Sequence, residues 1–239
     1  MAQSRPVRTA TVLATSWLNP SMVRVELRVE GGLGEGLFAD SYVKLLFDGV
    51  PRAYTVRRAV GEDVWIDFVV HGDEGLAGPW AAAAVPGNAI EFVGPGGAWS
   101  PRPGADLHVF IGDESALPAI ASGLERLGGA PSVVFAEIAG PGYEYPLDAQ
   151  VTWVHRGDAL YGSRLVDAVL AAGVPAGDLE VFLHGNAEMV RPLRRWLLRE
   201  VGLPREHLSA SGYWRAGLTD EAWRATKRDF NAAMEAETS

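Results

Sequence analysis

The sequence predicts a two-domain protein in which an antiparallel β domain is followed by an α/β domain. Up to about residue 100, short runs rich in Val, Ile, Phe and Tyr are separated by Gly and Pro turns, the spacing of a small antiparallel β-barrel. A segment dense in Gly and Pro at 96–106 is typical of an interdomain connection. Beyond it, strand-like and helical runs alternate, which predicts a parallel sheet of the nucleotide-binding type.

The first domain, placed at residues 1–103, contains six predicted strands and one predicted helix. The strands cover residues 8–18, 22–31, 42–49, 52–59, 64–72 and 89–97. The run "GPWAAAAVPGN" at 78–88 predicts a short helix that Pro86 and Gly87 end. Trp80 within it is expected to anchor the core.

The second domain, placed at residues 104–239, alternates five strands with four helices. The strands cover 107–111, 132–138, 151–154, 179–185 and 208–214, and the helices cover 114–129, 159–173, 187–202 and 219–237. Thr219 is the expected N-cap of the last helix. With one domain of each type, we expect two ligands to meet at the crevice between the domains.

Composition and charge exclude several classes of function. The 239 residues include no cysteine, which excludes disulfides, cysteine-ligated iron–sulfur clusters and thiol nucleophiles. A net charge of −9 disfavours nucleic-acid binding. The five histidines are scattered without helical spacing, so we expect no protein-ligated metal. No apolar run approaches the roughly 20 residues of a membrane span, and the N-terminus lacks the apolar region of a signal peptide, so a cytoplasmic protein without membrane insertion is expected.

Four segments together resemble the siderophore-interacting protein family, whose members are flavin-dependent ferric-siderophore reductases of the ferredoxin-reductase-like superfamily. They are "RAYTVR" at 52–57, "DFVVHG" with "GLAGPWA" at 67–81, "GDESALPAI" at 112–120 and "SGYWRAGLTDE" at 211–221. The resemblance covers nearly the whole chain, from "MVRVEL" to the terminal helix. The first motif alone is shared more widely in the superfamily, and the last two make the assignment to the family specific.

The resemblance implies that the strand at 52–59 holds FAD. Arg52 would pair with the pyrophosphate, because a planar guanidinium suits phosphate oxygens. Tyr54 would pack against the isoalloxazine and Thr55 would hydrogen-bond near N5, and these two are the expected catalytic residues. Val56 and Arg57 are further expected cofactor contacts, whereas Arg58 is expected to face solvent. Taken alone, such residues also suit an exposed strand with no ligand.

A second flavin segment is implied at 67–81, where small residues precede a helix whose N–H groups could hold a phosphate. The family commonly has Gly-Pro-Ala-Ser where this chain has Gly75-Leu76-Ala77-Gly78, so one hydroxyl contact is missing. For His71 the alternative is a contact within the turn, with no role in binding a ligand. The expected cofactor-binding residues of this segment are Asp67, Val70, His71, Gly72, Gly75, Ala77 and Gly78.

In the second domain the first strand-to-helix turn is not the G-x-G-x-x-G of a dinucleotide site. Its two acidic residues favour a helix start but would repel a pyrophosphate. The resemblance places this turn beside the nicotinamide, with Pro118 tolerated in the first helical turn, and a purely structural turn is the alternative. The expected cofactor-binding residues are Gly112, Asp113, Glu114, Ser115, Gly185, Tyr213 and Trp214. The helix arginines Arg191, Arg194 and Arg195 are expected to form a solvated face.

The sequence features that indicate the electron donor and the electron acceptor are weaker. Glu137 ends a strand at the position where an acidic residue would bond a ribose 2′-hydroxyl, which favours NADH over NADPH. Arg156 nearby favours NADPH instead. The long terminal helix resembles the NADH- or ferredoxin-linked branch of the family, so a ferredoxin is a further possible partner. Ferric siderophores are often anionic, and an acidic protein needs local positive charge to attract them. The expected substrate-binding residues are Lys44, Arg215, Lys227 and Arg228, each of which could equally be an ordinary surface charge.

The function expected from this reading is FAD-dependent reduction of ferric siderophores by NAD(P)H or a protein donor, in a monomer that releases Fe(II). One alternative is a ferredoxin-reductase-like flavoprotein that reduces free flavin, a quinone or a protein partner. A second alternative is a non-catalytic protein that binds a siderophore or flavin.

Overall fold

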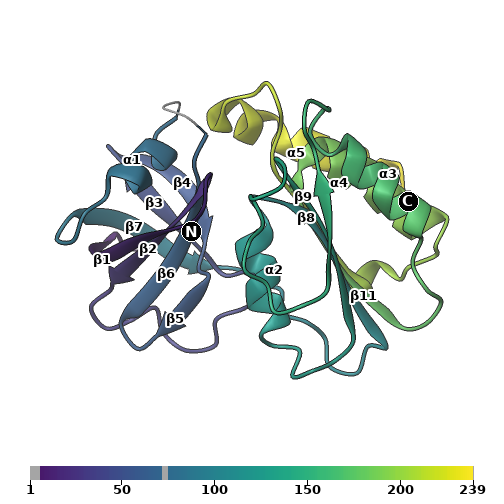
Figure 1. Ribbon diagram of the computed structural model, residues 1–239, viewed down its shortest axis with the longest axis horizontal. Coiled ribbons are helices and arrows are strands. Elements are labelled where there is room, and N and C mark those ends of the chain that lie inside the picture. The colour runs from purple at the N-terminus through teal and green to yellow at the C-terminus, as the bar shows by residue number, and fades with distance from the viewer. Residues whose placement is uncertain (1–5, 72–74, 239) are drawn as a thin grey trace. The chain divides into compact units, whose positions relative to one another are not determined.

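The computed structural model describes residues 6–71 and 75–238 (Figure 1). The chain forms two compact units. The first contains the chain up to Ser100 together with Ala121–Arg126, and the second contains Pro101–Ile120 and the chain from Leu127 onward. An antiparallel sheet builds the first unit and a parallel sheet the second, which confirms the predicted fold class.

Seven strands form the antiparallel sheet of the first unit. They are β1 (Arg8–Asn19), β2 (Met22–Arg28), β3 (Tyr42–Phe47), β4 (Val50–Thr55), β5 (Arg58–Val60), β6 (Asp63–Val69) and β7 (Ala89–Gly96). Their order is β4-β3-β7-β1-β2-β6-β5, so β4 and β5 are the two edge strands. Inward-facing residues such as Leu45, Ile66 and Phe92 alternate with exposed ones and form the core.

The prediction of one continuous strand at 52–59 is wrong, because the backbone changes its hydrogen-bonding partner in the middle of this segment. The Val56 N–H donates to the Ser41 carbonyl at 2.7 Å, whereas the Arg57 N–H donates to the Trp65 carbonyl at 2.9 Å. Before this point the chain pairs with β3, and after it with β6. The predicted strand is therefore two short strands, β4 and β5, on opposite edges of the sheet order.

Helix α1 (Ala77–Ala83) covers part of this core and ends ahead of Pro86 and Gly87. Its Trp80 ring lies 5.7 Å from the ring of Phe47 and 5.7 Å from that of Phe68, measured between centroids. Trp80 thus anchors the core, as predicted.

Five strands form the parallel sheet of the second unit: β8 (Leu107–Asp113), β9 (Ser132–Ile138), β10 (Val151–His155), β11 (Leu179–Asn186) and β12 (Leu208–Trp214). Their order is β10-β9-β8-β11-β12. The order reverses direction between β8 and β11, and ligands of such sheets bind at the carboxyl ends of the strands at this point.

Between these strands lie α2 (Leu117–Leu124), α3 (Ser163–Ala172), α4 (Ala187–Arg199) and the 3₁₀ turn η1 (Arg205–His207), and helix α5 (Asp220–Ala236) follows β12. Helices α3 and α4 lie side by side over one face of the sheet (Figure 1). Thr219 caps α5, since its side chain accepts the Ala222 N–H at 3.2 Å, which confirms the predicted N-cap. Within the residues that the structure describes, no helix combines the length and the apolar character that crossing a membrane requires.

One predicted surface residue of α4 is buried instead. Arg191 and Arg195 are exposed as predicted, but Arg194 is only 2% exposed. Its guanidinium donates to the Met234 carbonyl at 2.7 Å and to the Thr238 hydroxyl at 2.6 Å. The last carbonyls of a helix need donors from outside, and Arg194 supplies them to α5. The prediction of a solvated face is therefore wrong for Arg194.

Candidate functional site

The edge strand β4 presents an arginine and a tyrosine on one face. Arg52 and Tyr54 alternate along the strand and lie opposite Leu45 and Val43 of β3 in register. Both side chains are half-buried. The Tyr54 ring packs on the ring of Phe68 with centroids 4.3 Å apart and planes tilted by 36°. By the alternation of a strand, the edge strand thus carries a guanidinium and a supported aromatic ring on the same face.

The neighbours of these two residues point elsewhere. Thr55 lies opposite Tyr42, on the other face of β4, and Val56 is buried. The Arg57 side chain pairs with Glu125, with 2.5 Å between Nη2 and Oε1. The structure therefore brings Arg52 and Tyr54 together but separates Arg57 from them, and the flavin roles expected for all five residues stay predictions.

The second expected flavin segment is described except for Gly72, which lies outside the described residues. Asp67 is 3% exposed, and Arg24 donates to both of its carboxylate oxygens at 2.7 Å. The Val70 N–H donates to the Ser21 carbonyl, and His71 is exposed. Ala77 is buried at the start of α1, whereas Gly75 has a positive φ of 82°.

Gly78 has room for a side chain. A Cβ built there meets the Val69 carbonyl oxygen and the Val70 Cα at 3.5 Å, which is ordinary van der Waals contact. The backbone at this position would accept the serine that the family commonly has. What this chain lacks at Gly78 is therefore only the hydroxyl group.

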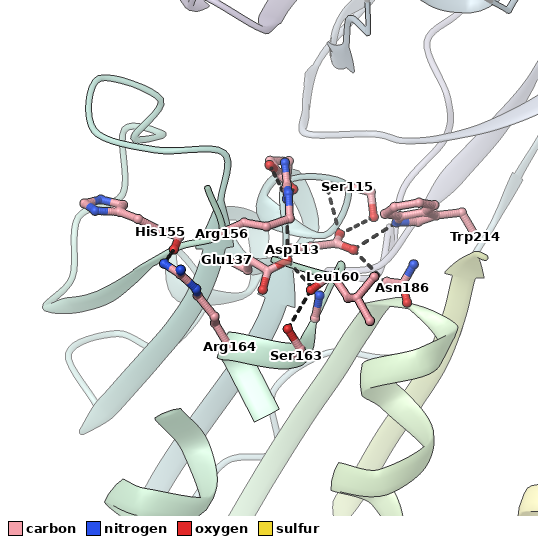
Figure 2. Close-up of polar contacts among 12 residues, drawn as sticks. Asp113, Ser115, Glu137, His155, Arg156, Leu160, Ser163, Arg164, Asn186 and Trp214 are labelled. Atoms are coloured by element: carbon pink, nitrogen blue, oxygen red, sulfur yellow. Dashed lines mark hydrogen bonds and ion pairs between the residues drawn. The ribbon is translucent and has the colours of Figure 1, made fainter. Parts of the chain in front are cut away.

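Asp113 joins three strand ends at the carboxyl edge of the parallel sheet (Figure 2). Its carboxylate accepts the Ser115 N–H at 3.0 Å, the Asn186 N–H at 2.7 Å and the Trp214 indole N–H at 2.9 Å. The Ser115 hydroxyl, at 2.5 Å, is a further donor. Burial raises the pKa of Asp113, and these hydrogen bonds act against that rise.

Gly185 allows this close approach of β11 to β8. Its φ is 132°, and a Cβ built there would lie 2.7 Å from the Asp113 carboxylate carbon. No side chain fits at that distance, so the sheet reaches this geometry only with glycine at position 185.

A second buried ionic cluster contains Glu114, Glu137 and Arg156. Figure 2 shows Glu137 and Arg156 next to Asp113. Nη1 of Arg156 lies 3.0 Å from Glu114 Oε1 and 3.5 Å from Glu137 Oε1. Glu137 also accepts the Gly162 N–H at 2.8 Å. Burial, followed by the negative charge of Asp113, raises the pKa of Glu114 to about 7.

Glu137 and Arg156, expected as opposing determinants of the nucleotide, form an ion pair. Glu137 is 0% exposed. Its Oε1 accepts from Arg156 and from the Gly162 N–H, while its Oε2 is buried with no hydrogen-bond partner among the described residues. The preference for NADH stays a prediction.

Tyr213 belongs to a hydrogen-bonded group that sequence reasoning missed. Its hydroxyl lies 3.0 Å from Nδ1 of His184, and Nε2 of that histidine lies 2.9 Å from the Ser209 hydroxyl. The His184 ring stacks on Phe182 at 3.8 Å between centroids. Burial lowers the pKa of His184 to about 3, so its ring is neutral at pH 7. The alternation of His184 with Phe182 along β11 is the signal that could have indicated a core position.

The four expected substrate-binding cations have different surroundings. Lys44 is exposed on β3 of the first unit, opposite Ala53. In the second unit, Arg215 pairs with Glu188 at 2.6 Å, and Lys227 lies 3.4 Å from the Ser211 hydroxyl. Arg228 is exposed beside Asp229. The basic patch stays a prediction.

Residues 6–71 and 75–238 contain no group of three or more His, Asp or Glu side chains placed to hold a metal ion.

The two sheets and their order define the ferredoxin-reductase-like fold. The ferredoxin reductase of carbazole 1,9a-dioxygenase superposes with a TM-score of 0.70 at 20% identity, over 90% of this chain and 69% of that one. A siderophore utilization protein from T. fusca superposes with a TM-score of 0.80 at 33% identity, over 90% of this chain and 95% of that one.

Comparison of sequences identifies the family. Residues 105–217 match the profile of the siderophore-interacting protein family, and residues 48–99 match that of the siderophore-interacting FAD-binding domain. A protein of Mycobacterium tuberculosis is 39% identical over 96% of this chain and 97% of its own length. The ferric vibriobactin reductase of Vibrio cholerae is 36% identical over 73% of this chain and 68% of its own length. The chain belongs to the siderophore-interacting protein family.

Proposed function

We propose that this protein is a cytoplasmic FAD-dependent oxidoreductase that reduces ferric siderophores and releases Fe(II). The proposal is supported by the match of residues 48–99 to a FAD-binding domain and by a relative named as a ferric vibriobactin reductase. Residues 1–103 would form the FAD-binding domain. Residues 104–239 would form the domain for NADH or NADPH, and a ferredoxin is the alternative donor.

The observation that carries the proposal is the edge strand β4, which lies within the matched FAD-binding range. The groups present there fit FAD. Arg52 carries a planar guanidinium, the group that suits a pyrophosphate, and its Nη1 donates to the Pro51 carbonyl at 3.1 Å. Tyr54 offers a ring already supported by Phe68. When bound, the flavin supplies the redox chemistry, accepting a hydride and passing on single electrons.

The residues of the chain would position the flavin and neutralise the charge of its pyrophosphate. Arg52 would neutralise the pyrophosphate, and Tyr54 would fix the plane of the isoalloxazine ring. Thr55 would place its hydroxyl near N5, and Gly75 and Gly78 would leave room for the cofactor beside α1. No catalytic acid–base pair is needed, which agrees with a site made of Arg, Tyr and Thr.

For the electron donor, the carboxyl edge of the parallel sheet is the proposed site. Here the Asn186 Nδ2 is buried and has no hydrogen-bond partner among the described residues, so an acceptor on a ligand would satisfy it. Gly112, Ser115, Gly185 and Trp214 would line this edge. Asp113 is saturated by protein donors and would act indirectly, by holding Asn186 and Trp214.

Iron is the substrate in this scheme. Siderophores bind Fe(III) through hard oxygen ligands, which hold Fe(II) far less well, so that reduction releases the metal. Because the protein carries a net charge of −9, an anionic ferric siderophore needs local cations to approach it. Lys44, Arg215, Lys227 and Arg228 are the proposed contacts.

The absorbance of the purified protein tests the proposal. We expect flavin bands, bleached anaerobically by NADH, NADPH or a reduced ferredoxin and restored by a ferric siderophore. A protein that cannot be loaded with FAD would contradict the proposal. Faster reoxidation by free flavin or a quinone would indicate a general flavin-linked reductase, and bands that no donor bleaches would indicate a carrier.

A further inference from the structure

The first unit contains a cavity of about 470 Å³ whose lining includes Val56 and Arg57, two expected flavin contacts, but otherwise consists of residues without a proposed role. Its walls come from the loop at 34–38, the segment at 56–59 and the segment at 122–126, and all of these residues belong to the first unit. None of them is Arg52, Tyr54 or Thr55. The volume falls within the roughly 300–1,000 Å³ of small-molecule sites.

Three arginines and one carboxylate give this cavity its charge. Arg57, Arg58 and Arg126 line it, and Glu125 is the one acidic residue among its lining side chains. The lining thus carries a net charge of +2 in a protein whose net charge is −9. All three guanidinium groups act on the same carboxylate, and together they lower the pKa of Glu125, with the hydrogen bond from Arg57 as the largest cause.

The guanidinium of Arg126 is held in place before any ligand arrives. Its Nη1 donates to the Ser122 carbonyl at 2.7 Å, and its Nη2 lies 3.4 Å from the Leu37 carbonyl. The Ser122 carbonyl lies in the last turn of α2, where the helix dipole is negative. Arg126 therefore neutralises the negative end of α2, which would otherwise repel an anion.

The other two arginines are placed by β5 and β6. The Arg57 backbone is bonded to Trp65, and Cζ of Arg58 lies 5.8 Å from the centroid of the Trp65 ring. Arg58 is exposed, whereas the Arg57 side chain is 12% exposed. The cavity thus has guanidinium groups both on its wall and at its exposed side.

We infer that this cavity binds a small molecule that carries two or more closely spaced oxyanions, as phosphate or carboxylate groups. Guanidinium forks match the geometry of such groups and bind them through charge-assisted hydrogen bonds. One carboxylate cannot neutralise three arginines, and a dianion would balance the remaining charge. The inference does not rest on the proposed reductase activity.

Calorimetric titration of the full-length protein at low ionic strength tests the inference, with inorganic pyrophosphate as the phosphate probe and citrate as the carboxylate probe. We expect at least one of them to bind, with an affinity that falls as salt screens the charges. Failure of both probes to bind in the millimolar range would overturn the inference.

Three variants locate the binding. Arg58→Gln and Arg126→Gln should each weaken it by roughly tenfold, the loss expected for one charge-assisted hydrogen bond. Glu125→Gln should strengthen it, because it removes the only negative charge of the lining. The matched control is Arg28→Gln, since Arg28 pairs with Asp63 on the surface of the same unit outside the cavity. Equal affinity in Arg28→Gln and Arg58→Gln would overturn the assignment.

The same titration with saturating FAD separates this site from the proposed flavin site. We expect the anion to bind equally well with FAD present. Loss of binding on addition of FAD would show that the probe occupies the flavin phosphate site and would overturn the inference. Since the readout is heat of binding, a failure of the reductase proposal leaves this result interpretable.

Discussion

The edge of β4 and the carboxyl edge of the parallel sheet are both rich in polar side chains, but they use them differently. On β4, Arg52 and Tyr54 are half-buried on a sheet edge. At the parallel sheet, Asp113, Glu114 and Glu137 are almost fully buried and are bonded to Arg156, Trp214 and backbone N–H groups. The side chains of the first region remain partly exposed, whereas the buried carboxylates of the second hold strand ends together. Substitutions at β4 should therefore change binding, and those at the parallel sheet should change stability.

The largest expected effect is a pH dependence of stability that comes from Glu114. Its pKa in the folded protein is about 7 against an ordinary 4.5. Between these values the folded protein holds a proton that the unfolded chain has released, so stability from this group is full below pH 4.5 and is lost as the pH rises through 7. The shift corresponds to about 3 kcal/mol.

Urea unfolding of the wild type and of Glu114→Gln at pH 5 and pH 8 measures this contribution. Glutamine mimics the protonated acid, so the variant should lose less stability than the wild type over this range. The neighbours Asp113, Glu137 and Arg156 are common to both proteins, so the difference reports the titration of Glu114 together with its coupling to them. Parallel pH profiles would show that Glu114 does not titrate in this range.

The second expected effect is on FAD affinity. Arg52→Ala should raise the dissociation constant of FAD by roughly thirtyfold, equivalent to about 2 kcal/mol for the lost charge-assisted hydrogen bonds. Fluorescence titration of the flavin measures it. Arg195→Ala is the matched control, because Arg195 is exposed on α4, whereas the buried Arg194 would report on folding instead. Equal affinities in the two variants would refute the phosphate role of Arg52.

A smaller loss is expected from Trp214→Phe, which removes one donor to the buried Asp113 carboxylate and keeps an aromatic ring. The free energy of unfolding should fall by about 1.5 kcal/mol, the low end for a hydrogen bond to a charged group. Trp17→Phe is the control, because the Trp17 side chain is 52% exposed. An equal fall in the free energy of unfolding in both variants would show that the hydrogen bond to Asp113 is not the cause.

The smallest expected effect is a gain from Gly78→Ser. The backbone has room for the side chain, and serine is a better helix residue than glycine by about 0.5 kcal/mol. Stability should rise by this amount. FAD affinity should rise a few-fold if the hydroxyl makes the contact that other family members have. Unchanged FAD affinity would place position 78 away from the cofactor.

Much of the second unit could be predicted from local sequence. The strand predicted at 107–111 is found at Leu107–Asp113, and the one predicted at 208–214 has the same bounds in the structure. Buried parallel strands read as continuous apolar runs, and Thr219 has the residue type and spacing of an N-cap. These features depend on neighbours in the chain, which is why the sequence alone indicates them.

Predictions made from the sequence fail where a hydrogen-bond partner that is distant in the chain determines the local structure or the burial of a residue. Val56 and Arg57 suit a strand, but bonds to Ser41 and Trp65 divide it. Arg194 has the composition of a surface position, but carbonyl and hydroxyl groups about 40 residues further along the chain need its donors. Likewise, the partners of Glu137, namely Arg156 and Gly162, lie 19 and 25 residues further along the chain and could not be predicted from local sequence.

By itself the sequence determined the two kinds of sheet, the family and the β4 motif, because periodicity, turns and short motifs are local properties of the chain. Only the tertiary structure decided which charged groups are buried and which remain partly exposed. Arg52 and Glu137 are both charged strand residues, and they differ in what the fold places beside them. Burial and hydrogen-bond partners set the pKa and availability of each group, and both depend on segments that are distant in the chain.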